Sequence, residues 1–182
     1  MSLSFSFFFL LVGVLVSLPA PAQAHGLGKE KVTHLHFYLH DVISGDKPTA
    51  VQIAQPNVTL GVQSATPFGT VFAINDPITS LPVINPTTIV GDAQGIYVST
   101  GLEKLGLVMM VDFGFTHGKF NGSSFSVMSR NPVMEGTGRE VAVVGGRGKF
   151  RFGRGSARLT TYYLNPANGD AIIEFNVTIL HY

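Results

Sequence analysis

The chain has 182 residues, of which 45% are hydrophobic and only 13% are charged, and its formal net charge is +1. A chain this close to neutrality has no basic excess of the kind that nucleic-acid-binding domains carry, so we expect no nucleic acid as a partner. Cysteine is absent, which excludes disulfides and leaves core size, sheet closure or oligomerisation as the sources of stability.

The N-terminal segment has the form of a secretory signal peptide. Residues 5–18 are almost all Phe, Leu, Val and Ser, and Ala22-Gln23-Ala24 is an A-x-A cleavage site, although no Lys or Arg precedes the apolar run. The run is too short to be a good membrane span. We predict a signal peptide over residues 1–24 and one domain over residues 25–182, secreted to the extracellular space and free of the membrane after cleavage.

Three N-x-[ST] sequons follow in the secreted part, at Asn57, Asn121 and Asn176. Two other asparagines, Asn85 and Asn165, are each followed by proline and do not qualify. In a secreted chain, sequons are predicted glycan sites.

From residue 32 onward the sequence reads as short strands with alternating polarity. In residues 32–41, Leu35, Phe37, Leu39 and Asp41 share one face. Further strands are expected at 49–54, 68–74, 94–100, 107–116, 123–129, 139–144, 149–163 and 171–182. Asn75-Asp76-Pro77 is expected to end the third strand, and residues 78–92 to form a long connection.

No segment longer than two turns has helical periodicity, and Gly, Pro and Asn separate the strands. About eight or nine short strands with such turns predict an all-β fold, an antiparallel β-barrel or sandwich. We prefer a barrel, because glycine corners favour closure and a closed barrel leaves no free strand edge. We expect five apolar side chains of the first and last strands to face inward: Leu35, Phe37, Leu39, Phe175 and Val177.

Residues 139–155 predict a strand, a glycine corner and a second strand. Gly145 and Gly146 break the alternation after Val143, and Phe150 and Phe152 are expected to share a face of the next strand. The Gly-Gly-x-Gly run is not followed by a helix pattern, so a phosphate site is disfavoured. We expect no cofactor.

Three residues are candidates for a site. Arg139 opens a strand whose other same-face residues are apolar, so it lies either in solvent at a frayed end, which the pattern favours, or at the mouth of an apolar cavity. Asp41 either caps the following turn, which the pattern favours, or is a desolvated acid with a raised pKa. Tyr97 is either a core or rim aromatic or a hydroxyl in a cavity.

His34, His36 and His40 share the other face of the first strand, a spacing that also occurs in zinc sites. Tyr38 interrupts the set, and no matching ligand appears in another strand pattern. We interpret these histidines as solvent or subunit-interface residues and expect no metal.

A series of short segments covers nearly all of residues 25–182 in order: His36-Phe37-Tyr38-Leu39-His40-Asp41, Pro48-Thr49-Ala50, Asn75-Asp76-Pro77-Ile78-Thr79, Ala93-Gln94-Gly95-Ile96-Tyr97, Phe120-Asn121-Gly122-Ser123, Arg130-Asn131-Pro132, Arg139-Glu140, Val143-Val144-Gly145-Gly146, Phe150-Arg151-Phe152, Gly169-Asp170-Ala171 and residues 174–182. With these segments the chain resembles the plant dirigent proteins.

The resemblance implies an eight-stranded barrel that is secreted to the apoplast and forms a homo-oligomer, a trimer rather than a dimer. It implies a small phenolic substrate and a stereochemical role in lignan or phenylpropanoid biosynthesis. Phenoxy radicals of the coniferyl alcohol type, made by a separate laccase or peroxidase, would couple selectively without any oxidase activity of the barrel itself. The pocket acid, arginine and tyrosine of the family fall on Asp41, Arg139 and Tyr97.

Two departures point to alternatives. Asn75 stands where the family begins its Asp-Asp-Pro block, and Arg130-Asn131 stands where lignan-forming members carry a second pocket aspartate. The chain therefore looks more like the broad branch that includes pterocarpan-forming members, which dehydrate an isoflavanol through a quinone methide. A cell-wall phenolic binder with no stereochemical role is a further alternative.

Overall fold

The computed structural model describes residues 28–57, 60–61, 63–135 and 138–182. Its elements are β1 (Lys31–Asp41), β2 (Ala50–Ala54), β3 (Val71–Thr79), β4 (Ile89–Ser99), β5 (Leu107–Phe115), the 3-10 turn η1 (Gly118–Phe120), β6 (Ser124–Asn131), β7 (Arg139–Arg147), the 3-10 turn η2 (Gly148–Phe150), β8 (Arg154–Leu164) and β9 (Ala171–His181). In this part of the chain, no helix is long and apolar enough to span a bilayer. The predicted signal peptide lies outside the described residues.

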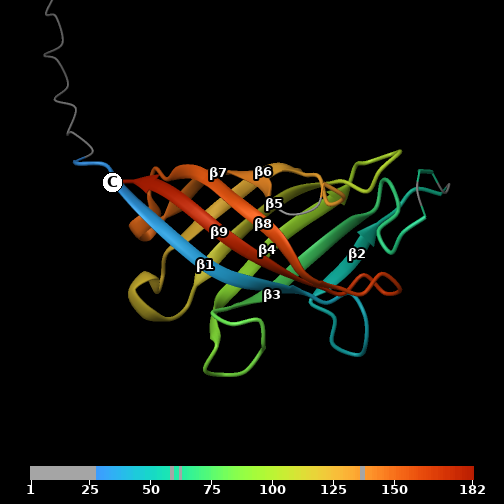
Figure 1. The fold of residues 1–182 in the computed structure, drawn as a ribbon, viewed down its shortest axis with the longest axis horizontal. Coiled ribbons are helices and arrows are strands. Elements are labelled where there is room, and N and C mark those ends of the chain that lie inside the picture. The colour runs from blue at the N-terminus through green and yellow to red at the C-terminus, as the bar shows by residue number, and fades with distance from the viewer. Residues whose placement is uncertain (1–27, 58–59, 62, 136–137) are drawn as a thin grey trace, which may run out of the picture.

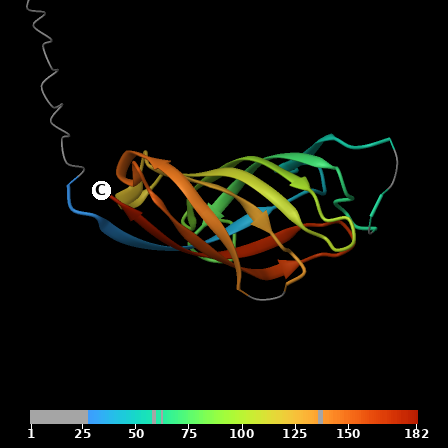
Figure 2. The same ribbon diagram turned by 90° about the horizontal axis from the view of Figure 1, so that it is seen from above.

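The strands close into an eight-stranded antiparallel barrel, as the sequence predicted (Figures 1 and 2). Neighbouring strands pair in the order β1-β9-β8-β7-β6-β5-β4-β3, and Tyr38 and Leu39 of β1 pair with Thr79 and Ile78 of β3 to complete the ring. The short β2 is a ninth strand that pairs with the first half of β3. Closure removes the free edges that a cysteine-free sheet would otherwise expose.

One half of the barrel interior is filled by phenylalanine rings. Phe37 stacks on Phe175 with ring centroids 5.2 Å apart, and Phe113 stacks on Phe125 at 5.0 Å. Phe37, Phe175 and two other residues expected to face inward, Leu39 and Val177, are buried, and Leu35 is partly buried against the same core. The alternation in β1 and β9 therefore predicted the inner face correctly.

The third strand runs further than expected. β3 continues through Asn75-Asp76-Pro77 to Thr79, so the connection to β4 spans only residues 80–88. β3 pairs with β2 up to Ile74 and with β1 from Ile78. Pro77 lies between these two ladders, where a strand tolerates a residue that has no N–H to donate.

The predicted glycine corner is wrong in its details. β7 continues through Gly145 and Gly146 to Arg147, with a bulge where it pairs with β6. The chain then turns through η2, where Phe150 is fully buried, while Phe152 is 59% exposed at a positive φ of 58°. The two phenylalanines do not share a strand face, because the turn interrupts the alternation between them.

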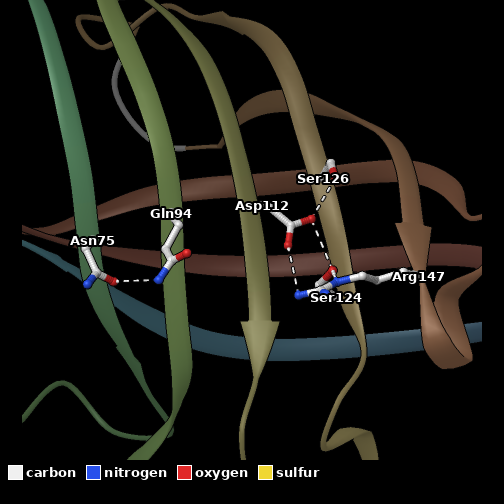
Figure 3. A network of polar contacts seen from close by, with 6 residues as sticks. All are labelled: Asn75, Gln94, Asp112, Ser124, Ser126 and Arg147. Atoms are coloured by element: carbon white, nitrogen blue, oxygen red, sulfur yellow. Dashed lines mark hydrogen bonds and ion pairs between the residues drawn. The ribbon is translucent and has the colours of Figure 1, made fainter.

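A row of polar side chains crosses the outer face of β3, β4, β5 and β6 (Figure 3). Gln94 donates to Asn75 at 3.3 Å, and Ser124 and Ser126 donate to Asp112 at 3.1 and 2.7 Å. Arg147 donates to Ser124 at 2.8 Å. These cross-strand contacts stabilise the strand register from outside, so this network is structural and separate from the interior.

Candidate functional site

The other half of the barrel interior is hollow. The β1–β2, β4–β5, β6–β7 and β8–β9 connections meet at the end of the barrel away from the chain's C-terminus (Figure 1). Residues at these strand ends line a cavity of about 360 Å³. Most of its wall is apolar; the polar side chains in it include Asp41, Asp76, Tyr97, Asn131, Arg139 and Thr161. Size and lining are typical of a small-molecule site. All three predicted site residues line this one cavity.

Asp41 ends β1 and lines the cavity with a poorly solvated carboxyl. Burial raises the pKa of Asp41 to about 7; the neighbouring Tyr97 hydroxyl opposes this rise, and the charge of Asp170 adds to it. Within the described residues, Asp41 Oδ1 has no hydrogen-bond partner. The backbone N–H groups of Ile43 and Ser44 are held by Asp170, so Asp41 is not the turn cap that the local pattern favoured.

Asp76 is a second acid that the sequence analysis did not single out. It is 0% exposed, and among the described residues neither of its carboxyl oxygens has a hydrogen-bond partner. Burial, followed by the charge of Asp41, raises the pKa of Asp76 to about 8, and the neighbouring Thr49 hydroxyl opposes this rise. Two neighbouring carboxyls of this kind do not ionise together readily, so the pair retains a proton near neutral pH.

A signal for Asp76 is present in the sequence. Phe72, Ile74, Asp76 and Ile78 alternate on β3 and are all buried. Because Asn75-Asp76-Pro77 was expected to end the strand, Asp76 was not counted as part of this face.

Tyr97 brings a hydroxyl to the same end of the cavity. Its ring stacks on Phe72 with centroids 5.0 Å apart, and the residue is 3% exposed. Burial, then the charges of Asp41 and Asp76, raises the pKa of Tyr97. The hydroxyl lies near the Asp41 carboxyl but makes no hydrogen bond of normal geometry within the described part of the chain. Tyr97 is thus a core aromatic whose hydroxyl remains free to bind a ligand.

Arg139 opens β7 and lies in the cavity wall, not in solvent as its place at a strand end suggested. It is 4% exposed, and its Nη1 donates to Thr161 Oγ1 at 2.8 Å and to the Val133 carbonyl at 3.4 Å. Burial lowers the pKa of Arg139. No ion pair joins Arg139 to an acid in the described structure, and its Nε has no partner there.

Asn131 ends β6 beside the same part of the wall. Its Nδ2 contacts Met109 Sδ at 3.4 Å, and its Oδ1 is buried without a partner among the described residues. The Val133 N–H donates to the Asn131 carbonyl at 3.0 Å, and the Val133 carbonyl accepts from Arg139. A free acceptor on Asn131 and a free donor on Arg139 therefore belong to residues that line the same cavity, where polar groups of a ligand can pair with them.

The three predicted glycan sites lie on the outside. Asn57, Asn121 and Asn176 are all exposed. The Thr of the first sequon lies outside the described residues, and Asn176 projects from the outward face of β9 between the buried Phe175 and Val177. Their modification stays a prediction.

The histidines of β1 have different environments. His34 and His36 are exposed, and His36 Nε2 lies 2.7 Å from Glu174 Oε1. His40 is buried against Thr79 at 2.7 Å, and burial lowers its pKa, so it is neither a solvent nor a surface residue of the isolated chain. Among the residues that the structure describes, no cluster of three or more His, Cys, Asp or Glu has the geometry to hold a metal ion.

Residues 32–180 match the family model for dirigent-like proteins. The chain is 50% identical to Dirigent protein 15 of Arabidopsis thaliana, over 86% of this chain and 83% of the relative. It is 46% identical to Pterocarpan synthase 1 of Glycyrrhiza echinata, over 86% of this chain and 82% of the relative.

Solved structures show the same barrel. The pterocarpan synthase dirigent protein GePTS1 superposes with a TM-score of 0.78 at 46% identity, covering 85% of this chain and 87% of that chain. The pterocarpan synthase dirigent protein PsPTS1 superposes with a TM-score of 0.76 at 45% identity, covering 84% and 96%.

Proposed function

The chain belongs to the dirigent-like protein family, and on that premise we propose that it is a dehydratase-type member that converts an isoflavanol to a pterocarpan through a quinone methide. The observation that carries this proposal is the pair of carboxyls, Asp41 and Asp76, which face an apolar cavity and together retain a proton near neutral pH. The similarity to pterocarpan synthases supports the same choice.

Dehydration of this kind needs both an acid and a base. The benzylic C–O bond of the isoflavanol breaks as its hydroxyl takes a proton and leaves as water, while the phenol conjugated to that carbon loses its own proton. The quinone methide that results is then attacked at the benzylic carbon by the second phenol, which loses its proton, while the quinone-methide oxygen takes a proton and the first ring regains aromaticity as a phenol. The net change is the loss of one water, so no oxidant is required.

The cavity residues suit these steps. Asp41 donates the proton to the leaving hydroxyl, because a carboxyl with a pKa near the working pH is an effective general acid. The phenol proton is released to solvent as the phenolate develops, because Asp76 has the higher pKa of the pair and is not the ionised carboxyl while Asp41 still holds its proton. Arg139, with its free Nε, stabilises the phenolate that develops. Asn131 Oδ1 accepts a hydrogen bond from a hydroxyl of the substrate.

Cavity size favours one substrate molecule over two. A volume of about 360 Å³ is near the lower end of the range for small-molecule sites. A single three-ring isoflavanol fills such a space, whereas coupling requires two phenolic radicals side by side.

The test is turnover of an isoflavanol by the purified protein in the absence of any oxidase, followed by chiral chromatography. We expect one pterocarpan enantiomer in excess and a product yield that follows protein concentration. Failure of the folded parent to exceed the buffer rate with a panel of isoflavanols would overturn the proposal.

Stereoselective coupling of phenoxy radicals remains a second candidate, supported by the 50% identity to Dirigent protein 15. A tenfold bias between two faces needs only about 1.4 kcal/mol, which contacts with the cavity wall can supply. Laccase or peroxidase with coniferyl alcohol would then give optically active lignan only when this protein is added. Binding of phenolics with unchanged product distribution would instead favour the wall-binding alternative.

Secretion to the apoplast and homo-oligomerisation are further proposals. Ile96, Met110 and Met128 lie opposite one another on the outer faces of β4, β5 and β6, and Met110 and Met128 are 37% and 58% exposed. An apolar row beside the polar row of Figure 3 supports burial of this face against further copies of the chain. Light scattering of the secreted protein measures the number of subunits directly.

A further inference from the structure

The segment that follows β1 is fastened to the turn between β8 and β9 by a single carboxylate. Asp170 Oδ1 accepts from the backbone N–H groups of Ile43 and Ser44 at 2.9 and 3.0 Å. Its Oδ2 accepts from Ser44 Oγ at 2.6 Å and from Asn168 Nδ2 at 2.8 Å. Four donors converge on this one side chain, so its position is tightly determined.

The clamp lies directly beside the proposed acid. Asp41 pairs with Ala171 across β1 and β9, so Asp170 is one residue from the partner of Asp41, and the clamped N–H groups begin two residues after Asp41. The turn that carries Asp170 is itself braced, because the N–H of Asn165 donates to the Asp170 carbonyl and the N–H of Gly169 donates to the Asn165 carbonyl, each at 2.8 Å.

Gly169 adds a steric fit at the same place. It has a positive φ of 85°, and a Cβ there would lie 2.9 Å from Ala65 Cβ and 3.0 Å from Ile43 Cδ1. The turn that carries Asp170 therefore packs closely against Ala65 and Ile43, without room for a side chain at residue 169.

Asp170 is the ionised member of this neighbourhood. Its partial burial raises the pKa, but the hydrogen bonds from Ser44, Ile43 and Asn168 together outweigh burial, so the pKa of Asp170 is lowered. Asp41 has the opposite environment, because its Oδ1 has no partner among the described residues. A fixed negative charge beside an unpartnered carboxyl favours the protonated form of that carboxyl.

We propose that Asp170 is a positioning residue for the acid at Asp41: it fixes the backbone that follows Asp41, and its charge retains the proton that Asp41 is to donate. The acid role of Asp41 rests on the proposed function, but the effect of Asp170 on the Asp41 proton does not. Asp170 does not line the cavity, so it acts on the reaction only through Asp41.

The other charged or titratable groups near Asp41 act in known directions. Asp76 on β3 opposes the ionisation of Asp41, and Tyr97 on β4 stabilises the ionised form. Arg139 on β7 lines the same cavity with the opposite charge. Because Asp76 titrates together with Asp41, the effect of Asp170 is best measured in an Asp76→Asn background, where one carboxyl of the pair remains.

The experiment is an NMR titration of the Asp41 carboxyl carbon in Asp76→Asn, with and without Asp170→Asn. The amide retains an oxygen for Ile43 and Ser44 and removes the charge. We expect the pKa of Asp41 to fall by about 0.5 pH unit, the size that a screened surface charge produces. An unchanged pKa in a folded Asp170→Asn variant overturns the proposal.

Two controls isolate the charge of Asp170. Ser44→Ala removes one hydrogen bond of the clamp and keeps the carboxylate, so we expect the pKa of Asp41 to stay within the error of the titration. Asp46→Asn removes an exposed carboxylate of the same connection and is expected to have no effect either. A shift in Asp46→Asn as large as in Asp170→Asn would mean that any nearby charge suffices, which also overturns the proposal.

A measurement that needs no change at residue 170 covers the case in which Asp170→Asn does not fold. Salt screens a partly exposed charge far more than a buried one. In the Asp76→Asn background, raising the salt concentration is expected to lower the pKa of Asp41, and a salt-independent pKa contradicts the proposal.

The activity readout separates this inference from the proposed function. If isoflavanol turnover is found, Asp170→Asn moves the alkaline limb of its pH–rate profile to lower pH, the same direction as in the titration. If turnover is absent but the NMR shift is present, the dehydratase proposal fails and the role of Asp170 stands.

Discussion

The two halves of the barrel interior are lined by the same strands, but one half is tightly packed and the other contains a cavity. Near the C-terminus, rings of Phe37, Phe113, Phe125, Phe150 and Phe175 pack against one another. Toward the other end, the same strands line a cavity in whose wall several polar atoms lack partners. Among the described residues, these atoms belong to Asp41, Asp76, Tyr97, Asn131 and Arg139.

The difference shows how stability and chemistry are divided within one barrel. Buried polar groups without hydrogen bonds lower the free energy of unfolding, whereas tightly packed rings raise it. Several buried core residues also line the cavity, so they form the boundary between the two halves: Leu39, Ile74, Tyr97, Met109, Leu159 and Phe175. The stability contributed by the packed half offsets the lower stability of the half that contains the cavity, whose unpartnered polar groups are available to a ligand.

The largest expected effect is the loss of activity in the cavity half when Asp41 is replaced by Asn. Asn has nearly the same size and can hydrogen-bond, but it has no proton to donate to a leaving hydroxyl. Removal of a positioned general acid typically costs about 10²- to 10⁴-fold in rate. We expect this loss in isoflavanol turnover, with the melting temperature at least that of the parent.

The outcome that would contradict the acid role is a folded Asp41→Asn protein as active and as stereoselective as the parent. Asp46→Asn serves as the matched control, because Asp46 is an exposed carboxyl of the following connection. Its activity should equal that of the parent.

The packed half is expected to respond to Phe113→Ala by a loss of stability. Phe113 is fully buried and contacts the rings of Phe37, Phe125 and Phe175. Such truncations cost about 3–5 kcal/mol in free energy of unfolding. Denaturant unfolding measures the loss, and Phe152→Ala, at an exposed ring, is the control expected to cost much less. Similar losses in both variants would contradict the division into halves.

In the cavity half, Asp76→Asn is expected to increase the free energy of unfolding of the protein, and this increase should grow as the pH rises. The pKa of Asp76 is raised from 3.8 to about 8 in the folded protein, so between these values the unfolded chain is ionised while the folded one keeps its proton. The favourable contribution of the protonated carboxyl is complete below about pH 4 and is lost as the pH rises toward 8, at most about 1.4 kcal/mol per pH unit.

Melting curves of Asp76→Asn and the parent between pH 4 and 8 measure this difference. We expect the gap in melting temperature to widen in favour of the variant across that interval. A gap that is constant with pH would mean that Asp76 titrates normally. That result would contradict the proton that Asp41 and Asp76 are proposed to share.

The smallest expected effect is that of Tyr97→Phe. The Tyr97 hydroxyl makes no hydrogen bond of normal geometry in the described structure, so its removal should leave the free energy of unfolding unchanged or slightly increased. Activity is expected to fall by less than about 10-fold, the equivalent of one neutral hydrogen bond to the substrate. A severe loss of stability would show that the hydroxyl is structural.

The inner face of the barrel was determined by the sequence itself. Alternation in residues 32–41 and 171–182 placed Phe37, Leu39, Phe175 and Val177 inside, because successive side chains of a strand point to opposite faces. It also placed Asp41 on that face. The strand count and the absence of long helical periodicity predicted an antiparallel barrel or sandwich, and the argument against free strand edges favoured the barrel.

Other features were decided by contacts between distant segments. Local pattern placed Arg139 at a frayed end and Asp76 in a strand terminator, whereas the paired strands bury both in the cavity wall. The acid pair joins β1 to β3, and the clamp joins residue 170 to residues 43 and 44. A carboxyl's pKa depends on the solvent and charges around it, and these are set by which strands meet when the barrel closes, which no single strand pattern contains.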